Sequence, residues 1–304
     1  MIAAFLLAVT IAHPRAGASL PCVDRCYMIG AVEPGVTNIV VQGRNVPVYR
    51  TGAWATMVDV KSGTNVIQVA HSNHCFTVAE PPKPPKPGAK PPKPRVFEKL
   101  PYAGDRPKAH PSGKAPSQIT VVIDAGHGGR DSGALSPHGI EEKDANLRMA
   151  RALELELKKI GYNVVMTRTN DVAIALYDRA KIAHAVNADA FVSIHHNAPP
   201  VNKDPRLFRY TAVYAWNDIG MALAGAVNAR MAGALAPEVV NNGVPKANYA
   251  VTRNPEIPSC LVEVDFITSP EGEEASWDPL RRRKVAFAMA QGIADWARKA
   301  DSSQ

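Results

Sequence analysis

The sequence of 304 residues lacks several features that would each assign it to a class of protein. Beyond its first residues it has no apolar run long enough for a transmembrane helix, so we expect no stable membrane anchor. It has no HExxH motif, which excludes a thermolysin-like peptidase, and no GxxxxGK[ST] spacing of a phosphate-binding loop. Cysteine is scarce, with four residues. These absences leave a globular protein of one to three domains whose chemistry must come from other motifs.

Three of the cysteines fall in the first 80 residues: Cys22, Cys26 and Cys75. In an exported chain we expect one disulfide between Cys75 and either Cys22 or Cys26. A metal site formed by these cysteines and His74 is disfavoured, because the usual paired spacing is missing. Cys260 lies in the apolar run "CLVEVDF", which predicts a buried strand residue rather than a catalytic nucleophile.

The N-terminus carries an apolar run over residues 2–12, followed by Ala-Gly-Ala at 16–18. This small-x-small pattern predicts a secretory signal peptide over residues 1–18, and hence export to the periplasm, the cell envelope or the medium. No Lys or Arg precedes the apolar run, so the alternative is a buried N-terminal strand or helix. A lipoprotein anchor at Cys22 is disfavoured, because Leu20 and Pro21 precede it.

The formal net charge of +7 favours an anionic partner such as nucleic acid, anionic lipid or an acidic wall polymer. Part of this excess lies in the tract "EPPKPPKPGAKPPKPRV" that begins at Glu80. Proline and like-charged lysines favour an extended spacer, so residues 80–117 are predicted to be a linker. The tract could contact a wall polymer, but a solvated spacer is the better interpretation. We expect no nucleic-acid partner, and a monomer.

Composition changes on either side of this linker. Residues 19–79 consist of short runs rich in Val, Ile and Thr, separated by turn signals, which predicts a small all-β domain. Its turn spacing resembles that of small Ig-like β-sandwich modules, and such a domain could contact a wall polymer.

Residues 118–300 alternate strand-like and helix-like segments, which predicts an α/β domain with an open mixed sheet flanked by helices. The segments expected to be helical are residues 142–160, 176–188, 218–235 and 280–299. Strands are expected within 119–125, 162–168, 189–197, 209–216, 248–253 and 260–267.

Four polar residues in this domain lie at or near predicted strand ends or at a helix start: His127, Glu142, His195 and Glu263. In open α/β sheets, ligands bind at the carboxyl ends of the strands. Two histidines and a carboxylate form a known catalytic zinc set with a fourth position for water, so His127, Glu142 and His195 are the predicted Zn²⁺ ligands. Glu263 has apolar neighbours, and burying its charge is costly without a purpose, which suggests a catalytic proton shuttle.

Each of these residues has a structural alternative. The glycine-rich turn at residues 126–129 could bind a phosphate at a helix N-terminus, but no helix starts directly after it. Glu142 alone would be a helix N-terminal carboxylate, and His195 alone a core histidine. His196 should point to the opposite face of the strand from His195, so both are not expected to be ligands. His138 is a minor candidate on a loop.

Five sequence blocks occur in order: "IDAGHGGRDSGA", "GIEEKDANL", "TR" at 167–168, "ADAFVSIHHNA" and "CLVEVDFITSPEGE". Together they resemble the zinc-dependent N-acetylmuramoyl-L-alanine amidases of the bacterial cell wall, over about residues 118–300. The resemblance implies hydrolysis of the amide between N-acetylmuramic acid and L-alanine in peptidoglycan. It assigns the zinc ligands to His127, Glu142 and His195 and the catalytic role to Glu263. A lysine follows the ligand in the family pattern, which selects Glu142 over Glu141.

The sequence departs from the family pattern at Asp265, where glycine is usual, and at Ser269, where asparagine is usual. The short segment between His195 and Glu263 leaves little room for the extra helix that plugs the site in some periplasmic members. We therefore expect a site that is open without an activator.

The reaction also needs stabilisation of the oxyanion, for which Arg253 and Asn197 are candidates. Two other functions stay open from the sequence. One is a different zinc peptidase or amidohydrolase acting on wall peptides, and the other is a wall-binding protein with a vestigial site.

Overall fold

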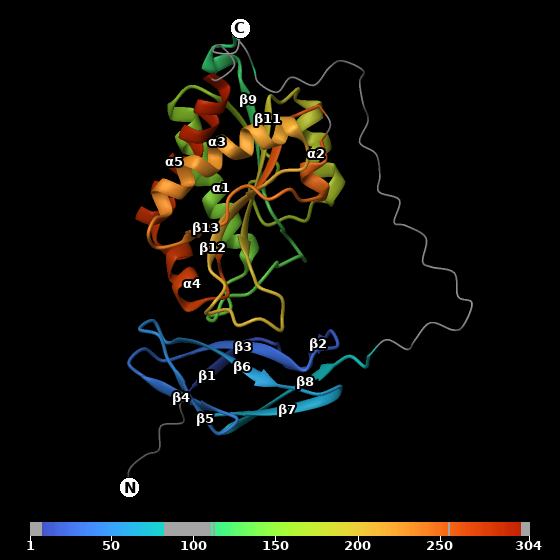
Figure 1. Cartoon of the computed structure of the whole chain (residues 1–304), viewed down its shortest axis with the longest axis vertical. Helices are drawn as coiled ribbons and strands as arrows, with labels where there is room; N and C mark the ends of the chain where they lie inside the picture. Colours follow the sequence, from blue (N-terminus) through green and yellow to red (C-terminus); the bar gives the residue numbers. More distant parts are fainter. Residues whose placement is uncertain (1–7, 82–110, 112, 255, 299–304) are drawn as a thin grey trace, which may run out of the picture.

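The computed structural model describes residues 8–81, 111, 113–254 and 256–298. Figure 1 shows an all-β part, drawn in blue, below an α/β part that contains the remaining strands and all the helices. Most of the predicted linker over 80–117 lies outside the described residues.

The N-terminal part is an all-β domain of two sheets, which confirms the all-β prediction. A five-stranded sheet has the order β2-β8-β7-β4-β5, and a three-stranded sheet has the order β1-β3-β6. Inward-facing side chains from both sheets, among them Met28, Trp54, Ile67 and Phe76, form one core. Exposed and buried residues alternate along β4, β7 and β8, so one face of the five-stranded sheet lies on this core, whereas β3 and β6 are buried on both faces. The strands are β1 (Val9–His13), β2 (Ser19–Leu20), β3 (Arg25–Val32), β4 (Asn38–Val41), β5 (Arg44–Pro47), β6 (Ala53–Asp59), β7 (Gly63–Val69) and β8 (Ser72–Val78).

The predicted disulfide is wrong, because all four cysteines lie among the described residues and are free. Cys26 is on β3 and its side chain is in the core. Cys75 is exposed on β8, where its neighbours His74 and Phe76 are the residues that face inward. The side-chain alternation of a strand therefore points Cys75 away from the core that holds Cys26. Cys260 is fully buried in a strand, as predicted.

Strand β1 lies inside the segment that the sequence predicts to be a signal peptide. Its residues pair antiparallel with β3, in the register Val9 with Val32 and Ile11 with Gly30. Cleavage after Ala18 would remove this edge strand from the three-stranded sheet. Sequencing the N-terminus of the exported protein distinguishes cleavage from the alternative of a retained N-terminal strand.

The C-terminal part is a mixed α/β domain, as predicted. Its six-stranded sheet has the order β10-β9-β11-β14-β12-β13, in which β10, β9, β11 and β14 are mutually parallel and β12 is antiparallel to β14. The strands are β9 (Thr120–Ala125), β10 (Asn163–Met166), β11 (Ala190–Asn197), β12 (Tyr210–Tyr214), β13 (Val240–Asn241) and β14 (Ser259–Phe266). The helices are α1 (Glu142–Lys159), α2 (Leu176–Ala185), α3 (Asp218–Leu235), α4 (Pro270–Trp277) and α5 (Pro279–Arg298).

Helices cover both faces of this sheet. Val121 and Ile123 of β9 pack in the larger core with α1, α3 and α5, whereas Val122 packs in a smaller cluster with Ala183 of α2. A strand that is buried on both faces reads as a continuous apolar run rather than an alternating one, which explains "TVVIDA". None of the helices in the described ranges is both long enough and apolar enough to cross a membrane.

One predicted strand is wrong. The segment expected to be a strand at 248–253 contains a 3-10 turn, η2 (Ala250–Thr252). The Thr252 hydroxyl donates to the carbonyl oxygens of Ala247 and Tyr249, which closes the turn locally. Val251 packs in the smaller cluster, so its apolar side chain covers one face of the sheet, while its backbone lies in the turn and not in a strand.

Candidate metal centre and catalytic cleft

The sheet topology gathers the candidate residues at one edge. Strands β9, β11 and β14 are adjacent and parallel, so their carboxyl ends meet. His127 follows β9 by two residues, His195 lies near the end of β11, and Glu263 is its register partner on β14. Ligand sites in open α/β sheets form at this edge.

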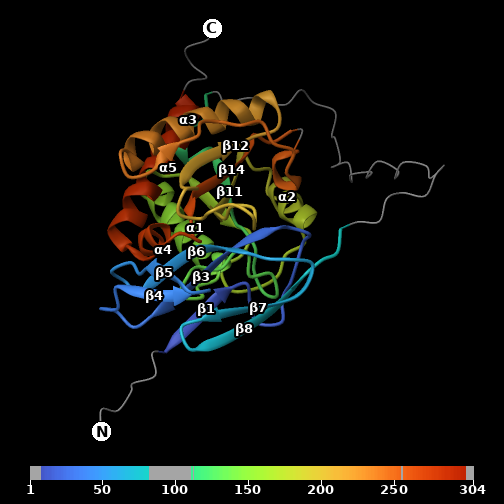
Figure 2. The same cartoon turned by 60° about the horizontal axis from the view of Figure 1, so that its bottom comes forward.

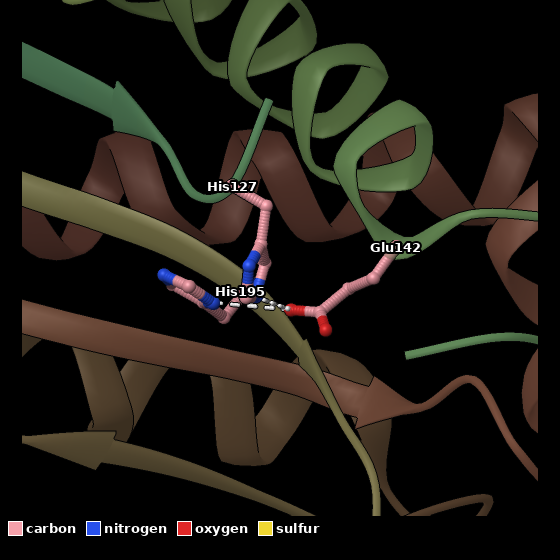
Figure 3. A group of neighbouring side chains, drawn as sticks. All are labelled: His127, Glu142 and His195. Atoms are coloured by element: carbon pink, nitrogen blue, oxygen red, sulfur yellow. Dashed lines mark hydrogen bonds and ion pairs between the residues drawn. The ribbon is translucent and has the colours of Figure 1, made fainter. Parts of the chain in front are cut away.

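Three side chains converge there, from β11, from the start of α1 and from the turn after β9 (Figure 3). Glu142 Oε1 lies 3.1 Å from His127 Nε2 and 3.0 Å from His195 Nδ1. One ligand atom from each residue lies within 4.8 Å of the others. Zinc–ligand distances are about 2.0–2.2 Å, so small side-chain adjustments would let one ion bind all three. The donor set of two imidazoles and a carboxylate fits Zn²⁺ and leaves a fourth position open.

The carboxylate of Glu142 is held from two sides. Its Oε2 accepts a hydrogen bond from the Ala134 N–H at 2.9 Å, and Oε1 accepts one from the His196 N–H at 3.2 Å. Burial would raise the pKa of Glu142, but its hydrogen bonds with His127 and His195 outweigh burial and lower that pKa below its usual range. The carboxylate of this candidate ligand is therefore ionised.

His127 adopts an unusual backbone conformation, with φ of 61°. A non-glycine residue in the left-handed region costs free energy and persists where its surroundings determine it. Here the His127 carbonyl accepts from Arg179 Nη2 at 2.8 Å, and its Nδ1 lies 2.9 Å from Asp131 Oδ2. Burial lowers the pKa of His127, but Glu142 and Asp131 together raise it to about 9. Asp131 thus orients the ring and leaves Nε2 facing Glu142.

At two positions beside the candidate ligands only glycine fits, because neighbouring side chains occupy the space of a Cβ. A Cβ on Gly126 would lie 2.2 Å from His195 Nε2, so the ring of this candidate ligand occupies the space that a side chain would need. A Cβ on Gly133, where φ is +64°, would lie 2.6 Å from Glu142 Oε2 and 2.7 Å from His127 Cδ2. These glycines leave room for the three side chains.

Glu263 lines the same cavity as both histidines but does not belong to the candidate metal-binding group. Its Oε2 is buried and has no hydrogen-bond partner in the part of the chain that the structure describes. Burial, with a further contribution from the charge of Glu142, raises the pKa of Glu263 well above its ordinary value of 4.5. A carboxylate with a raised pKa beside a metal-binding group is suited to accept and return a proton.

The cavity has a volume of about 630 Å³ and contains residues that the sequence analysis did not single out. Fully buried Asp124 accepts hydrogen bonds at 2.7 Å from Thr167 Oγ1, Arg179 Nη1 and Ser193 Oγ. Asp124, Thr167 and Ser193 lie in three of the five sequence blocks, whereas Arg179 lies in none of them. Other lining residues include Arg130, Ile174, Leu176, Arg179 and Tyr249.

Several residues considered from the sequence lie elsewhere. His138 Nδ1 contacts Glu273 Oε2 at 2.8 Å, and His196 Nδ1 contacts Asn146 Oδ1 at 2.9 Å, on the other face from His195. Neither oxyanion candidate, Arg253 or Asn197, lines the cavity.

The two departures from the family pattern also point away from the cavity. Asp265 is fully buried and accepts from Arg209 Nη2 at 3.0 Å and from Arg281 Nη2 at 2.7 Å. Ser269 caps α4 by accepting from the Gly272 N–H at 2.9 Å. Neither residue lines the cavity wall.

The fold and the site together define an α/β domain with a donor set typical of mononuclear metallohydrolases. A profile of the N-acetylmuramoyl-L-alanine amidase family matches residues 121–295, and the chain belongs to this family.

Named relatives agree with this assignment. The chain is 32% identical over 217 residues to the N-acetylmuramoyl-L-alanine amidase AmiC of Neisseria meningitidis, covering 57% of this chain and 51% of AmiC. It is 35% identical over 176 residues to the probable cell wall amidase LytH of Staphylococcus epidermidis, covering 57% of each. The chain therefore spans about half the length of these relatives.

Solved structures also resemble the C-terminal domain. The N-acetylmuramoyl-L-alanine amidase AmiC2 of Nostoc punctiforme matches with a TM-score of 0.56 and 36% identity, covering 60% of this chain and 98% of that one. The catalytic domain of CwlV, an N-acetylmuramoyl-L-alanine amidase from Paenibacillus polymyxa, matches with a TM-score of 0.55 and 32% identity, covering 59% and 97%.

Proposed function

We propose that this protein is a zinc-dependent hydrolase that cleaves the amide between N-acetylmuramic acid and L-alanine in peptidoglycan. The observation that carries the proposal is the convergence of His127, Glu142 and His195, with both histidines lining the same cavity as Glu263. Family membership supports the choice of this amide among the bonds that such a site could hydrolyse.

The three donor residues would hold the metal, since their atoms already converge and Ala134 and Asp131 orient two of them. Zinc, when bound, polarises a carbonyl and lowers the pKa of a water molecule. Glu263 takes the proton from the attacking water and returns it to the leaving amine of L-alanine. Its buried, unpartnered Oε2 and raised pKa support this role, because a stronger base accepts the proton more readily.

The cavity supports a substrate of mixed character. Arg130 supplies a positive charge, while Leu176 and half-exposed Tyr249 supply apolar and aromatic surface. A peptide stem attached to a sugar presents carboxylates, methyl groups and a ring face, so each part of the cavity has a matching part of the substrate.

Three variants of the full chain test this proposal: His127→Ala, Glu263→Gln and, as a control, His71→Ala. We expect His127→Ala to lose zinc and activity, and Glu263→Gln to keep zinc but lose activity by roughly 10²–10⁴-fold. His71 is exposed in the N-terminal domain, so its variant should retain both properties. A His127→Ala protein that binds zinc normally and still releases peptide stems from wall sacculi would refute the proposal.

The products separate the proposal from its alternatives. Free L-alanine amines together with intact lactyl acids support the amidase. New ends within the peptide stem would indicate another zinc peptidase, and a zinc-free, inactive protein would indicate a wall-binding protein with a vestigial site.

We further infer that the catalytic domain spans residues 118–300 and that a linker over 80–117 joins it to an Ig-like β domain. An exported location suits a peptidoglycan substrate, and the N-terminal domain or the Lys/Pro tract would contact the wall polymer. Fractionation of cells that express the full chain tests the location, and sedimentation of the protein with purified sacculi tests the contact.

A further inference from the structure

The N-terminal domain has a second apolar face, on the outer side of its three-stranded sheet. Met28 and Trp54 point into the domain's own core, whereas Tyr27 and Ile29 of β3 and Met57 of β6 point to the opposite face. These outer residues are buried, with Ile29 at 0% exposure and Met57 at 9%. An apolar sheet face that is removed from water must have a covering partner.

The covering partner is the catalytic domain. Leu135 and Val201 pack against the outer face formed by Ala12, Tyr27, Ile29, Ala55 and Met57. The Tyr27 N–H also donates to the Val201 carbonyl at 2.8 Å, which fixes the two backbones. Figures 1 and 2 show β3 and β6 lying against the loops at this end of the α/β domain.

A polar contact flanks this apolar one. Tyr49 Oη and Arg50 Nη2 donate to Glu274 Oε2 of α4, at 3.0 and 2.7 Å. Exposed ion pairs contribute little to stability, so the apolar contact carries most of the energy and the polar one helps to set orientation.

Leu135 belongs to the loop that holds the candidate ligand Glu142. The preceding residue, Ala134, donates its N–H to Glu142 Oε2 at 2.9 Å, and its carbonyl accepts from the Glu142 N–H at 2.9 Å. Leu135 itself forms an isolated bridge with Glu141. A shift of Leu135 therefore moves the amide that orients this carboxylate.

The same loop is fastened from within the catalytic domain. Buried Glu273 of α4 accepts from Ser136 Oγ at 2.5 Å and from the His138 N–H at 2.8 Å. Glu273 thus holds the far end of the loop, and the outer face of the β domain covers Leu135. Contacts from both domains therefore hold this loop, and the N-terminal domain adds an ion pair between Arg15 Nη2 and Glu141 Oε1 at 3.5 Å.

We propose that the N-terminal β domain is a positioning element of the metal centre: it docks through Tyr27, Ile29 and Met57 onto Leu135 and holds the Ala134 amide against Glu142. This inference rests on the metal site of the proposed function, but not on its reaction. Second-shell partners typically change metal affinity by about 10–100-fold, so undocking should weaken zinc binding by roughly tenfold.

Zinc affinity of full-chain variants, measured by competition with a chromophoric chelator, tests the proposal. Met57→Gln and Leu135→Ala act from the two sides of the contact, and each should weaken zinc binding by roughly tenfold. The double variant should be no weaker than the stronger single one, because both remove the same contact. Met57→Leu should retain wild-type affinity. Val66→Gln is the control, because Val66 is 55% exposed on the other sheet of the same domain.

Amide hydrogen exchange of the metal-free proteins gives a second readout. Exchange over residues 132–141 should be faster in Met57→Gln than in the wild type, and unchanged in Val66→Gln. If Met57→Gln is folded by circular dichroism and matches the wild type in both zinc affinity and exchange, the docking role is refuted. A wild-type protein that binds no zinc would instead refute the proposed function, and the exchange comparison would then decide the docking role alone.

Discussion

Gly133→Ala is the substitution for which the structure gives the sharpest expectation. At Gly133 φ is +64°, and an added Cβ would lie 2.6 Å from Glu142 Oε2 and 2.7 Å from His127 Cδ2. Both distances are too short for a methyl carbon, so the two candidate ligands must move. Gly139 offers a matched control in the same loop, because its φ is +79° and an added Cβ would meet nothing within 4 Å.

Both substitutions carry the backbone cost of a positive φ, and only Gly133→Ala adds a steric contact with the candidate ligands. Each places alanine in the left-handed region, which costs about 1–2 kcal/mol of folding free energy. Only Gly133→Ala also displaces Glu142 and His127. Loss of ligand orientation changes metal affinity by about 10–100-fold, so Gly133→Ala should bind zinc at least tenfold more weakly and lose activity in proportion.

Chelator competition and urea unfolding measure the two costs separately. Gly139→Ala should lose about 1–2 kcal/mol in the free energy of unfolding and keep wild-type zinc affinity. Gly133→Ala should lose at least as much stability in the metal-free state, because the added Cβ also meets Glu142 and His127 there, and should bind zinc more weakly. Equal zinc affinities for the two variants would refute the reasoning, because the steric contact with the ligands would then have no effect.

Three further predictions concern the cleft. In a pH–rate profile, kcat/KM should fall on the acid side with a midpoint above pH 4.5. Glu263 must be ionised to accept a proton, and burial and the charge of Glu142 raise its pKa. A midpoint at or below 4.5 would exclude Glu263 as the base. Arg179→Leu should destabilise the protein by about 3–5 kcal/mol in urea unfolding, since it removes the ion-pair partner of buried Asp124. Lys158→Ala removes an exposed ion pair and should change stability by less than about 1 kcal/mol, so similar losses for the two variants would contradict this prediction. Tyr249→Ala should raise KM for soluble wall fragments several-fold with unchanged zinc content, and an unchanged KM would show that this side chain does not contact the substrate.

Local sequence patterns were sufficient to predict much of the α/β domain. The helix expected at 218–235 is α3 (Asp218–Leu235), and the buried strands read as uninterrupted apolar runs. The strand predicted at 248–253 was wrong, because β-branched and aromatic residues occur both in strands and in turns that cover a sheet. Only the packing of Val251 against the sheet distinguishes the two.

The disulfide prediction was wrong for a different reason. Spacing alone allowed Cys75 to pair with Cys22 or Cys26, but a bond also requires side chains that point toward each other. Strand register sets that direction, and register depends on which partner strand is chosen.

By itself the sequence determined which residues could supply the chemistry, because His127, Glu142, His195 and Glu263 lie in motifs whose residue types suit metal binding and proton transfer. The tertiary structure decided what holds them. Asp131 and Ala134 orient two of the candidate ligands, buried Asp124 organises the floor of the cleft, and the N-terminal domain reaches Leu135 from more than 70 residues away. Such contacts join segments that are distant along the chain, and local periodicity carries no information about which distant segments will meet.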